Sequence, residues 1–252
     1  MPDSSDSSHE RLAPHPVLSR YYRDENERPH IVRGMFDDSA SEYDWIESFM
    51  SFGTGIGYRK RILEEVGLTE GMRVLDVATG TGSVARASRD LSGPKGYVAA
   101  LDPSFGMLLE AKRLGSPGIL DGRGEALPFA DETFDFLSMG YALRHVADLK
   151  IVFHEYARVL RPGGRVAIFE ISRPASRVGE LFLGIYLGRF IPLVARVFGH
   201  REAGRLMRYY WDTIKTCVPP STIVDALREC GFSGVERKVE LGIFSSYLGV
   251  KD

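Results

Sequence analysis

The chain has 252 residues, of which 44% are hydrophobic and 26% charged, and its formal net charge is -2. This size and composition suit one folded domain around one large core, and the evenly mixed charges exclude the basic field of a typical nucleic-acid binder. Only two cysteines occur and their spacing is not that of metal ligands, so we expect no bound metal. The N-terminal segment does not read as an apolar secretory signal, so we expect a cytoplasmic protein.

The N-terminal part of the chain divides into two segments. Residues 1–18 are rich in Ser, Asp, His and Pro and lack periodic apolar positions, which predicts a disordered tail. Residues 19–67 show apolar positions at three- and four-residue spacing, which predicts helices that cap the rest of a single domain over 19–252. Tyr22, Phe36 and Tyr43 lie in these helices and are expected to cover a ligand or to pack in the core.

Strand and helix patterns alternate through the rest of the chain. The predicted strands cover 73–78, 96–101, 134–139 and 165–171, and the predicted helices cover 83–91, 106–114 and 151–160. Such alternation implies right-handed crossovers and a parallel sheet. A helix over 222–230 and two strands over 235–241 and 244–250 predict a closing antiparallel hairpin.

A glycine-rich turn follows the first predicted strand. Gly80 and Gly82 let the backbone approach a ligand, and Asp102 follows about 20 residues on, a pattern that also fits an NAD(P)-dependent oxidoreductase. Asp76, at the strand end, would repel a pyrophosphate but suits a ligand with an ammonium and a sulfonium. S-adenosylmethionine (SAM) is such a ligand, and Asp102 can accept hydrogen bonds from both of its ribose hydroxyls.

Several sequence motifs occur together in a fixed order. They are Phe36-Asp37-x-x-Ala40-x-x-Tyr43-Asp44, Met50-Ser51-Phe52-Gly53, the glycine-rich turn, Glu125-Ala126-Leu127-Pro128-Phe129, Leu143-Arg144, Arg158-Val159-Leu160-x-Pro162-Gly163-Gly164 and Glu170-x-Ser172-x-Pro174. With these motifs the sequence, from about Phe36 to Val250, resembles the quinone C-methyltransferases of the UbiE/Coq5 family.

The resemblance implies a fold and a cofactor. The fold is the class I methyltransferase fold, a Rossmann-like three-layer α/β sandwich with a seven-stranded, mostly parallel sheet and an antiparallel last strand. The cofactor is SAM, with S-adenosylhomocysteine as product. Together with the motif chemistry above, the expected cofactor-binding residues are Asp76, Ala78, Gly80, Thr81, Gly82, Asp102, Pro103, Met107, Arg123, Gly124, Glu125 and Gly140.

The chain departs from the family pattern at three positions. Where the family usually has Asn or Asp followed by Ala beside the adenine, this chain has Arg123-Gly124, and a guanidinium cannot accept a hydrogen bond. Glu125 or a backbone carbonyl is expected to take that role. Ser83 replaces the acid that commonly follows the family's loop, and His145 replaces the Asn after its Leu-Arg pair.

Tyr141, Arg144 and His145 follow the fourth predicted strand and are the candidate catalytic residues. A phenolic acceptor must lose its proton or have its anion stabilised. Arg144 could stabilise the anion while a water takes the proton, or His145, titrating near neutrality, could accept the proton directly. The alternative is that Arg144 forms a structural salt bridge and His145 a helix cap.

The segment 181–198 is almost continuously apolar. A membrane span is not expected, because Arg189 would lie near the bilayer centre at ~2.5–3.5 kcal/mol and Pro192 would break the helix. The family resemblance instead implies a helical insertion over 172–220 that borders the acceptor site. It could serve as a lid or a membrane-surface helix for a lipid-tailed substrate, with contact through 181–211, or as a homodimer interface, or simply be part of the core.

The leading functional hypothesis is SAM-dependent C-methylation of a hydrophobic aromatic acceptor of the polyprenyl hydroquinone type. The departures at Arg123 and His145 keep open O-, N- or C-methylation of a soluble secondary metabolite. An NAD(P)-dependent oxidoreductase and a SAM-binding regulator without catalytic activity are the remaining alternatives.

Overall fold

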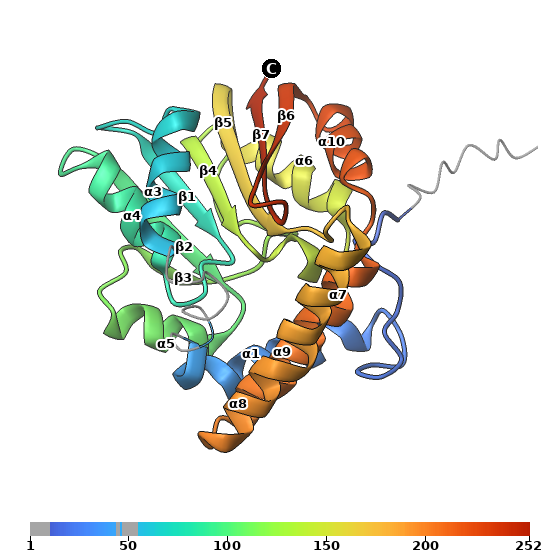
Figure 1. The fold of residues 1–252 in the computed structure, drawn as a ribbon. Coiled ribbons are helices and arrows are strands. Elements are labelled where there is room, and N and C mark those ends of the chain that lie inside the picture. The colour runs from blue at the N-terminus through green and yellow to red at the C-terminus, as the bar shows by residue number, and fades with distance from the viewer. Residues whose placement is uncertain (1–10, 44–45, 47–54) are drawn as a thin grey trace, which may run out of the picture.

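A seven-stranded sheet forms the centre of the molecule in the computed structural model, which describes residues 11–43, 46 and 55–252 (Figure 1). The strands are β1 (Arg73–Val77), β2 (Tyr97–Asp102), β3 (Ile119–Asp121), β4 (Phe134–Gly140), β5 (Leu160–Ile171), β6 (Phe232–Glu240) and β7 (Phe244–Lys251). Their order is β3-β2-β1-β4-β5-β7-β6, and β7 runs antiparallel to both neighbours. The predicted fold class is confirmed, and β3 is the strand that the sequence pattern does not reveal.

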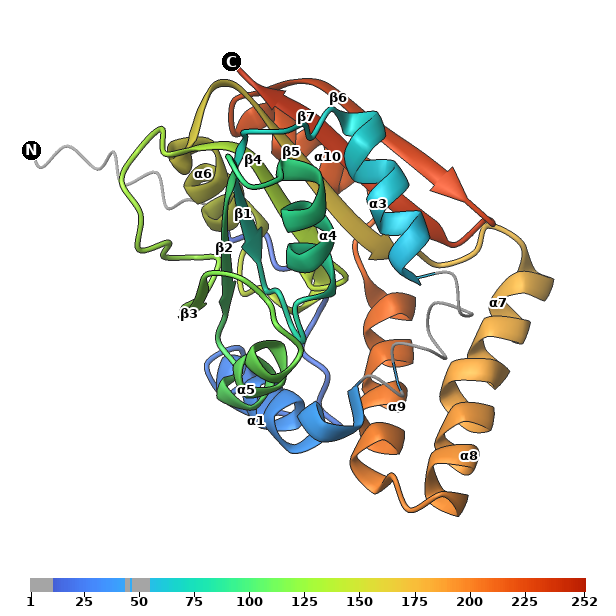
Figure 2. The ribbon, with the colours of Figure 1, turned by 90° about the vertical axis from the view of Figure 1, so that its left-hand side faces the viewer.

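The central strands are buried on both faces, which is why they read as continuous apolar runs. Val74 and Phe136 pack toward α3 (Gly55–Val66) and α4 (Ser83–Ser92). Leu75 and Leu137 pack on the other side, toward α6 (Leu149–Val159) and α10 (Pro220–Glu229). Figure 2 shows the helices on the two sides of the sheet. The result is the expected three-layer sandwich.

The N-terminal segment packs against the domain. The backbone of Leu12 accepts a hydrogen bond from Leu149 N, and that of Pro14 accepts one from Val218 N. The prediction of a disordered tail over 1–18 is therefore wrong for residues 11–18. Backbone hydrogen bonds hold this segment in place although it has few apolar residues. The predictions for residues 1–10, for helix around Trp45 and Phe49, and for the Met50–Gly53 motif lie outside the described residues.

Two short elements then cover the carboxyl edge of the sheet. They are α1 (Glu27–Ser39) and the 3-10 helix η1 (Ala40–Glu42), which lie against α5 (Phe105–Arg113). The fit is close: a side chain on Gly106, in the first turn of α5, would come 3.1 Å from Ala40 Cβ. The predicted N-terminal cap is thus anchored on the helix that follows Asp102.

The insertion after β5 forms a helical arm. It consists of α7 (Arg177–Ile185), the π-helical turn η3 (Tyr186–Phe190), α8 (Ile191–Val197) and α9 (Arg201–Thr216). The first three form one continuous helix, so the prediction that Pro192 breaks the helix is wrong. Ile191 N donates to Tyr186 O, five residues back, and this wider turn accommodates the missing proline N–H.

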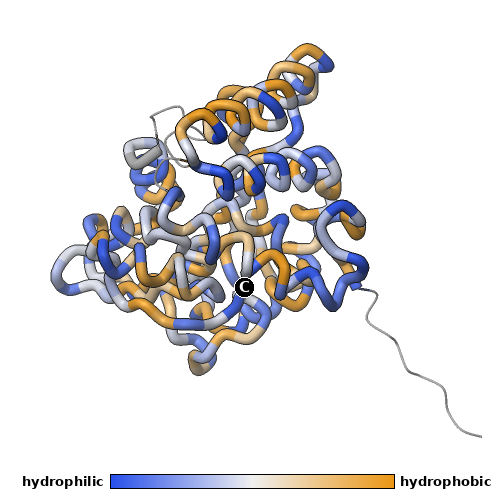
Figure 3. The backbone as a smooth tube through the Cα atoms, turned by 90° about the horizontal axis from the view of Figure 1, so that it is seen from below, coloured by the Kyte–Doolittle hydropathy of each residue, from blue (hydrophilic) through white to orange (hydrophobic). Residues whose placement is uncertain are grey.

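The arm projects from the sheet, and Figure 3 shows that hydrophobic residues dominate its outer helix. Within the described part of the chain, Arg177–Val197 is the one helix long and apolar enough to cross a membrane by length and composition. One of its sides packs on α9 through Leu183, Leu187 and Ile191. The other side exposes apolar side chains, so the helix carries two apolar stripes.

Candidate active site

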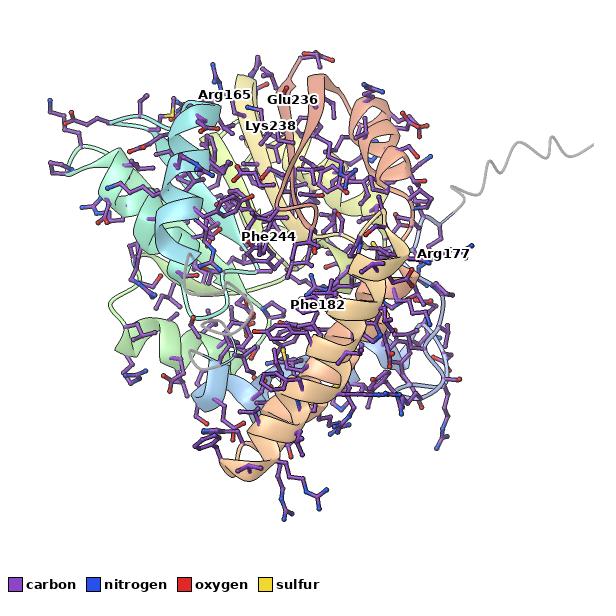
Figure 4. All side chains as sticks on the ribbon, viewed as in Figure 1. Arg165, Arg177, Phe182, Glu236, Lys238 and Phe244 are labelled. Carbon is purple, nitrogen blue, oxygen red and sulfur yellow. The ribbon has the colours of Figure 1, made fainter. Side chains whose placement is uncertain are left out.

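A cavity opens at the carboxyl ends of β1 and β4, where parallel strands of this fold bind ligands. One wall is the glycine-rich turn with Asp76, Ala78 and Thr81. Four aromatic side chains from distant segments also line the cavity and form its aromatic wall: Tyr43, Tyr141, Tyr210 and Phe244. Figure 4 labels Phe244, which lies at the start of β7, and Phe182 on the neighbouring helical arm.

The glycine-rich turn adopts backbone conformations that favour glycine. Gly80 has φ +57° and Gly82, the N-cap of α4, has φ +81°; a side chain at Gly82 would collide with Ser116. Thr81 is buried in the cavity wall, and its hydroxyl has no hydrogen-bond partner among the described residues. A buried polar atom without a partner is costly, so a ligand that bonds this hydroxyl fits the site.

Asp76 is fully buried at the end of β1. Its carboxylate accepts hydrogen bonds from Thr79 Oγ1 at 2.6 Å and from Ser138 Oγ at 2.7 Å. Burial raises the pKa of Asp76 to about 6, although both hydroxyls and the nearby Arg59 oppose the rise. A cationic group in the cavity would therefore be attracted to this carboxylate.

Asp102 ends β2 and is held by two backbone amides. Its Oδ2 accepts from Gly80 N and its Oδ1 from Ser104 N, both at 2.8 Å, and burial raises its pKa to about 6. Each oxygen keeps a further lone pair, so the carboxylate could still accept both hydroxyls of a ribose. Pro103 and buried Met107 follow it into α5.

The residues expected beside the adenine lie outside the cavity just described. Arg123 is exposed, and its backbone bridges to Ala126. Gly124 is buried, and an added Cβ would come 3.3 Å from Val77 Cγ1. One carboxylate oxygen of Glu125 accepts from Ala147 N at 2.8 Å, which leaves the other for a ligand.

Tyr141 is the one candidate catalytic residue that lines the cavity. It has φ +60°, an uncommon conformation for a bulky residue, and its backbone N donates to Phe169 O at 2.7 Å. Gly140, just before it, also lines the cavity, while Ala78, with φ +54°, occupies the corresponding place after β1. Backbone strain thus sits at the ends of two adjacent strands.

Arg144 lies behind the aromatic wall. Its Nη1 donates to Glu170 Oε2 at 2.5 Å, and its guanidinium carbon is 4.6 Å from the centre of the Tyr210 ring. The side chain is buried, and its Nε and Nη2 have no hydrogen-bond partner among the described residues. It borders a second cavity of about 270 Å³, which Cys217 also lines. The salt bridge of the alternative hypothesis is present.

His145 does not match its expected chemistry. Its ring stacks against Tyr209 and Tyr210 at centroid distances of 5.3 and 5.6 Å and meets Phe36 edge-on at 5.3 Å. Desolvation among these rings, and then the charge of Arg144, hold the pKa of His145 well below its ordinary value. The prediction that it titrates near neutrality is wrong, and it lines neither cavity described above.

The structure adds residues that the sequence did not mark. Tyr210 on α9 faces Tyr43, with their hydroxyl oxygens 3.0 Å apart. Arg59 on α3 lines the cavity over the ring of Tyr141. Glu170 appears within a family motif, but nothing in the sequence assigns it to Arg144. Contacts between such distant segments leave no local signal.

The reversed last strand, the glycine-rich turn, and acids at the ends of two adjacent strands define a class I SAM-dependent methyltransferase. Solved structures share the fold. A SAM-dependent methyltransferase of Thermotoga maritima, described as a possible histamine N-methyltransferase, aligns with a TM-score of 0.62 at 19% identity, over 87% of this chain and 99% of that one. A SAM-dependent methyltransferase of Aquifex aeolicus gives a TM-score of 0.56 at 23% identity, over 77% and 89%.

The chain belongs to the ubiE/COQ5 methyltransferase family, whose model matches residues 23–251. A ubiquinone/menaquinone biosynthesis C-methyltransferase of Geobacter sulfurreducens is 33% identical over 89% of this chain and 90% of its own length. A demethylmenaquinone methyltransferase of Corynebacterium efficiens is 38% identical over 88% and 95%. The protein is therefore a methyltransferase, and the oxidoreductase and regulator alternatives are set aside.

Proposed function

We propose that this enzyme transfers a methyl group from SAM to a ring carbon of a hydrophobic, polyprenyl hydroquinone-like acceptor. The observation that carries the proposal is the aromatic wall, which lines the same cavity as the glycine-rich turn. A flat apolar ring fits between aromatic side chains, and the named activities of the relatives above concern quinones of this kind.

SAM, when bound, supplies a methyl group on a sulfonium, an activated carbon. The residues of this chain then have to position the acceptor and stabilise its anion in a site without water. The paired hydroxyls of Tyr43 and Tyr210 are placed to bond an acceptor oxygen, and Arg144, beside the Tyr210 ring, favours negative charge there.

A water is best assigned to take the proton of the acceptor hydroxyl. Arg144 cannot take it, because a guanidinium stays protonated in proteins, and His145 is a weak base at its lowered pKa. Once the ring carbon has taken the methyl group and S-adenosylhomocysteine is formed, the hydrogen of that carbon passes through water to the oxygen, which restores the aromatic ring. We assign to Arg144 and the tyrosines the stabilisation of the anion, and to His145 the packing of Tyr209 and Tyr210.

An assay of the purified enzyme with SAM tests this proposal. A prenylated demethylnaphthoquinol and a soluble catechol are supplied separately, and the products are analysed by mass spectrometry and NMR. A methyl group on a ring carbon of the prenylated acceptor is expected, with no turnover by Asp102→Ala. Methylation of the catechol alone, or of an oxygen, would favour the secondary-metabolite alternative and overturn the proposal.

We also propose that the helical arm contacts a lipid surface. Its outer helix exposes Val178 at 79% and Val197 at 74%, together with Leu181, Phe182, Leu193 and Phe198. Residues 177–208 contain six arginines and two glutamates, and Glu180 already pairs with Arg173. A second copy of this stripe would bring like charges together, whereas anionic lipid headgroups complement them.

Sedimentation with vesicles tests the lipid contact. Binding to vesicles that contain phosphatidylglycerol is expected, with clear loss in the triple variant Leu181→Ser, Phe182→Ser and Leu193→Ser. Leu241→Ser, an exposed apolar residue of the β6–β7 turn, is the matched control. No sedimentation, together with a dimer in analytical ultracentrifugation that the triple variant dissociates, would overturn the lipid contact.

A further inference from the structure

Arg59 is a buried cation in the wall of the cofactor cavity. It lies on α3, its side chain is only 4% exposed, and its guanidinium carbon is 5.3 Å from the centre of the Tyr141 ring. Neither the family motifs in this sequence nor the spacing around residue 59 assigns it a role.

The same cavity wall carries the buried carboxylate of Asp76. The charge of Arg59 reaches this carboxylate and favours its ionised form, against the effect of burial. The hydroxyls of Thr79 and Ser138 each bond one oxygen of Asp76, which leaves further lone pairs on both. The wall therefore presents one fixed positive and one fixed negative group to the same small space.

A ligand group with both charges on neighbouring atoms would complement this wall. The amino-acid end of SAM has this form, since a single carbon carries an ammonium and a carboxylate. We propose that Arg59 binds the carboxylate of SAM while Asp76 binds its ammonium, so that Arg59 discriminates between cofactors that have and lack the carboxylate. The proposal rests on SAM being the methyl donor.

The other groups that line the cavity favour this assignment over a role with the acceptor. Tyr43 and Tyr210 offer hydroxyls and Phe244 a plain ring, whereas the charge of Arg59 acts on the carboxylate of Asp76. A guanidinium also matches a carboxylate in two parallel hydrogen bonds. A neutral hydroquinone ring offers it no comparable partner.

Three ligands separate the contributions in calorimetric titrations of the full chain. S-adenosylhomocysteine carries both charged groups, decarboxylated SAM keeps the ammonium but lacks the carboxylate, and 5′-methylthioadenosine lacks both. Arg59→Met should lower the affinity for S-adenosylhomocysteine about 10- to 100-fold. The affinities for the other two ligands should stay within about twofold. Asp76→Asn should instead weaken the two ligands that carry an ammonium.

The matched control is Arg61→Met, on the same helix but exposed and paired with Glu240, which should change no affinity. Arg59→Lys keeps the positive charge but lacks the paired donors of the guanidinium, so it should lose an intermediate share of the affinity for S-adenosylhomocysteine. It also replaces Arg59→Met as the test if that variant does not fold. An equal loss for all three ligands would assign Arg59 a structural role and overturn the inference. If the unmodified chain bound none of them, SAM use itself would fail, a separate result.

Discussion

The two walls of the cavity are built in different ways. The cofactor wall uses residues that are close in sequence, from Asp76 to Thr81, supported by Asp102 after the next strand. The acceptor wall gathers Tyr43, Tyr141 and Tyr210 from elements far apart in the chain. The first depends on local backbone chemistry, whereas the second depends on how the cap and the helical arm pack. Substitutions in the two walls should therefore have different consequences.

The largest effect is expected behind the acceptor wall. Glu170→Ala leaves Arg144 as a buried charge without its carboxylate, which should lower the free energy of unfolding by about 3–5 kcal/mol. Urea denaturation measures it. The control is Glu229→Ala, which breaks the exposed pair with Lys150 and should cost less than about 1 kcal/mol. Equal costs would show that the buried pair is not structural.

On the cofactor wall, the main effect should be on binding. Asp102→Ala removes the proposed acceptor of two ribose hydroxyls, so the affinity for S-adenosylhomocysteine should fall about 100-fold or more. Calorimetry measures the loss. The control is Asp90→Ala, which removes an exposed carboxylate of α4 and should leave the affinity for S-adenosylhomocysteine unchanged. If Asp102→Ala lowered this affinity less than about threefold, Asp102 would not be a contact of the cofactor.

The pH dependence of cofactor binding should distinguish the two walls further. Burial raises the pKa of Asp76 and of Asp102 to about 6, and the ligand requires both carboxylates ionised. The affinity for S-adenosylhomocysteine should be constant above that pH and fall below it, by up to about tenfold per pH unit for each group. Titrations from pH 5 to pH 8 measure the slope, which Asp76→Asn should reduce. A flat profile would contradict the proposed contacts.

The smallest effect is expected from a single hydroxyl of the acceptor wall. Tyr43→Phe removes the partner of the Tyr210 hydroxyl, which should lower kcat about 5- to 10-fold. Binding of S-adenosylhomocysteine should not change. Steady-state kinetics with the prenylated quinol gives kcat, and exposed Tyr97→Phe is the control. A change in cofactor affinity without one in kcat would place Tyr43 on the other wall.

The same contrast explains what the sequence could predict. Five of the seven strands follow from apolar runs, and β6, which is mostly exposed, from its place in a hairpin beside Gly242, while β3 has three residues and little burial. Asp76 and the glycine-rich turn were found because a ligand loop imposes local constraints. Arg59 and Tyr210 were missed because packing alone brings them to the cavity. The predicted titration of His145 was wrong because three aromatic rings from distant segments exclude water from its imidazole.

The contacts of residues 11–18 determine when this segment can dock during folding. Leu12 N donates to Asp148, 136 residues along the chain, and Pro14 O accepts from Val218. A growing chain emerges from the ribosome in sequence order, so residues 11–18 must wait for α6 and for the segment after α9 before they can dock. Contacts of such long range form slowly. Residues 11–18 therefore dock late in folding, after α6 and α9 have been translated.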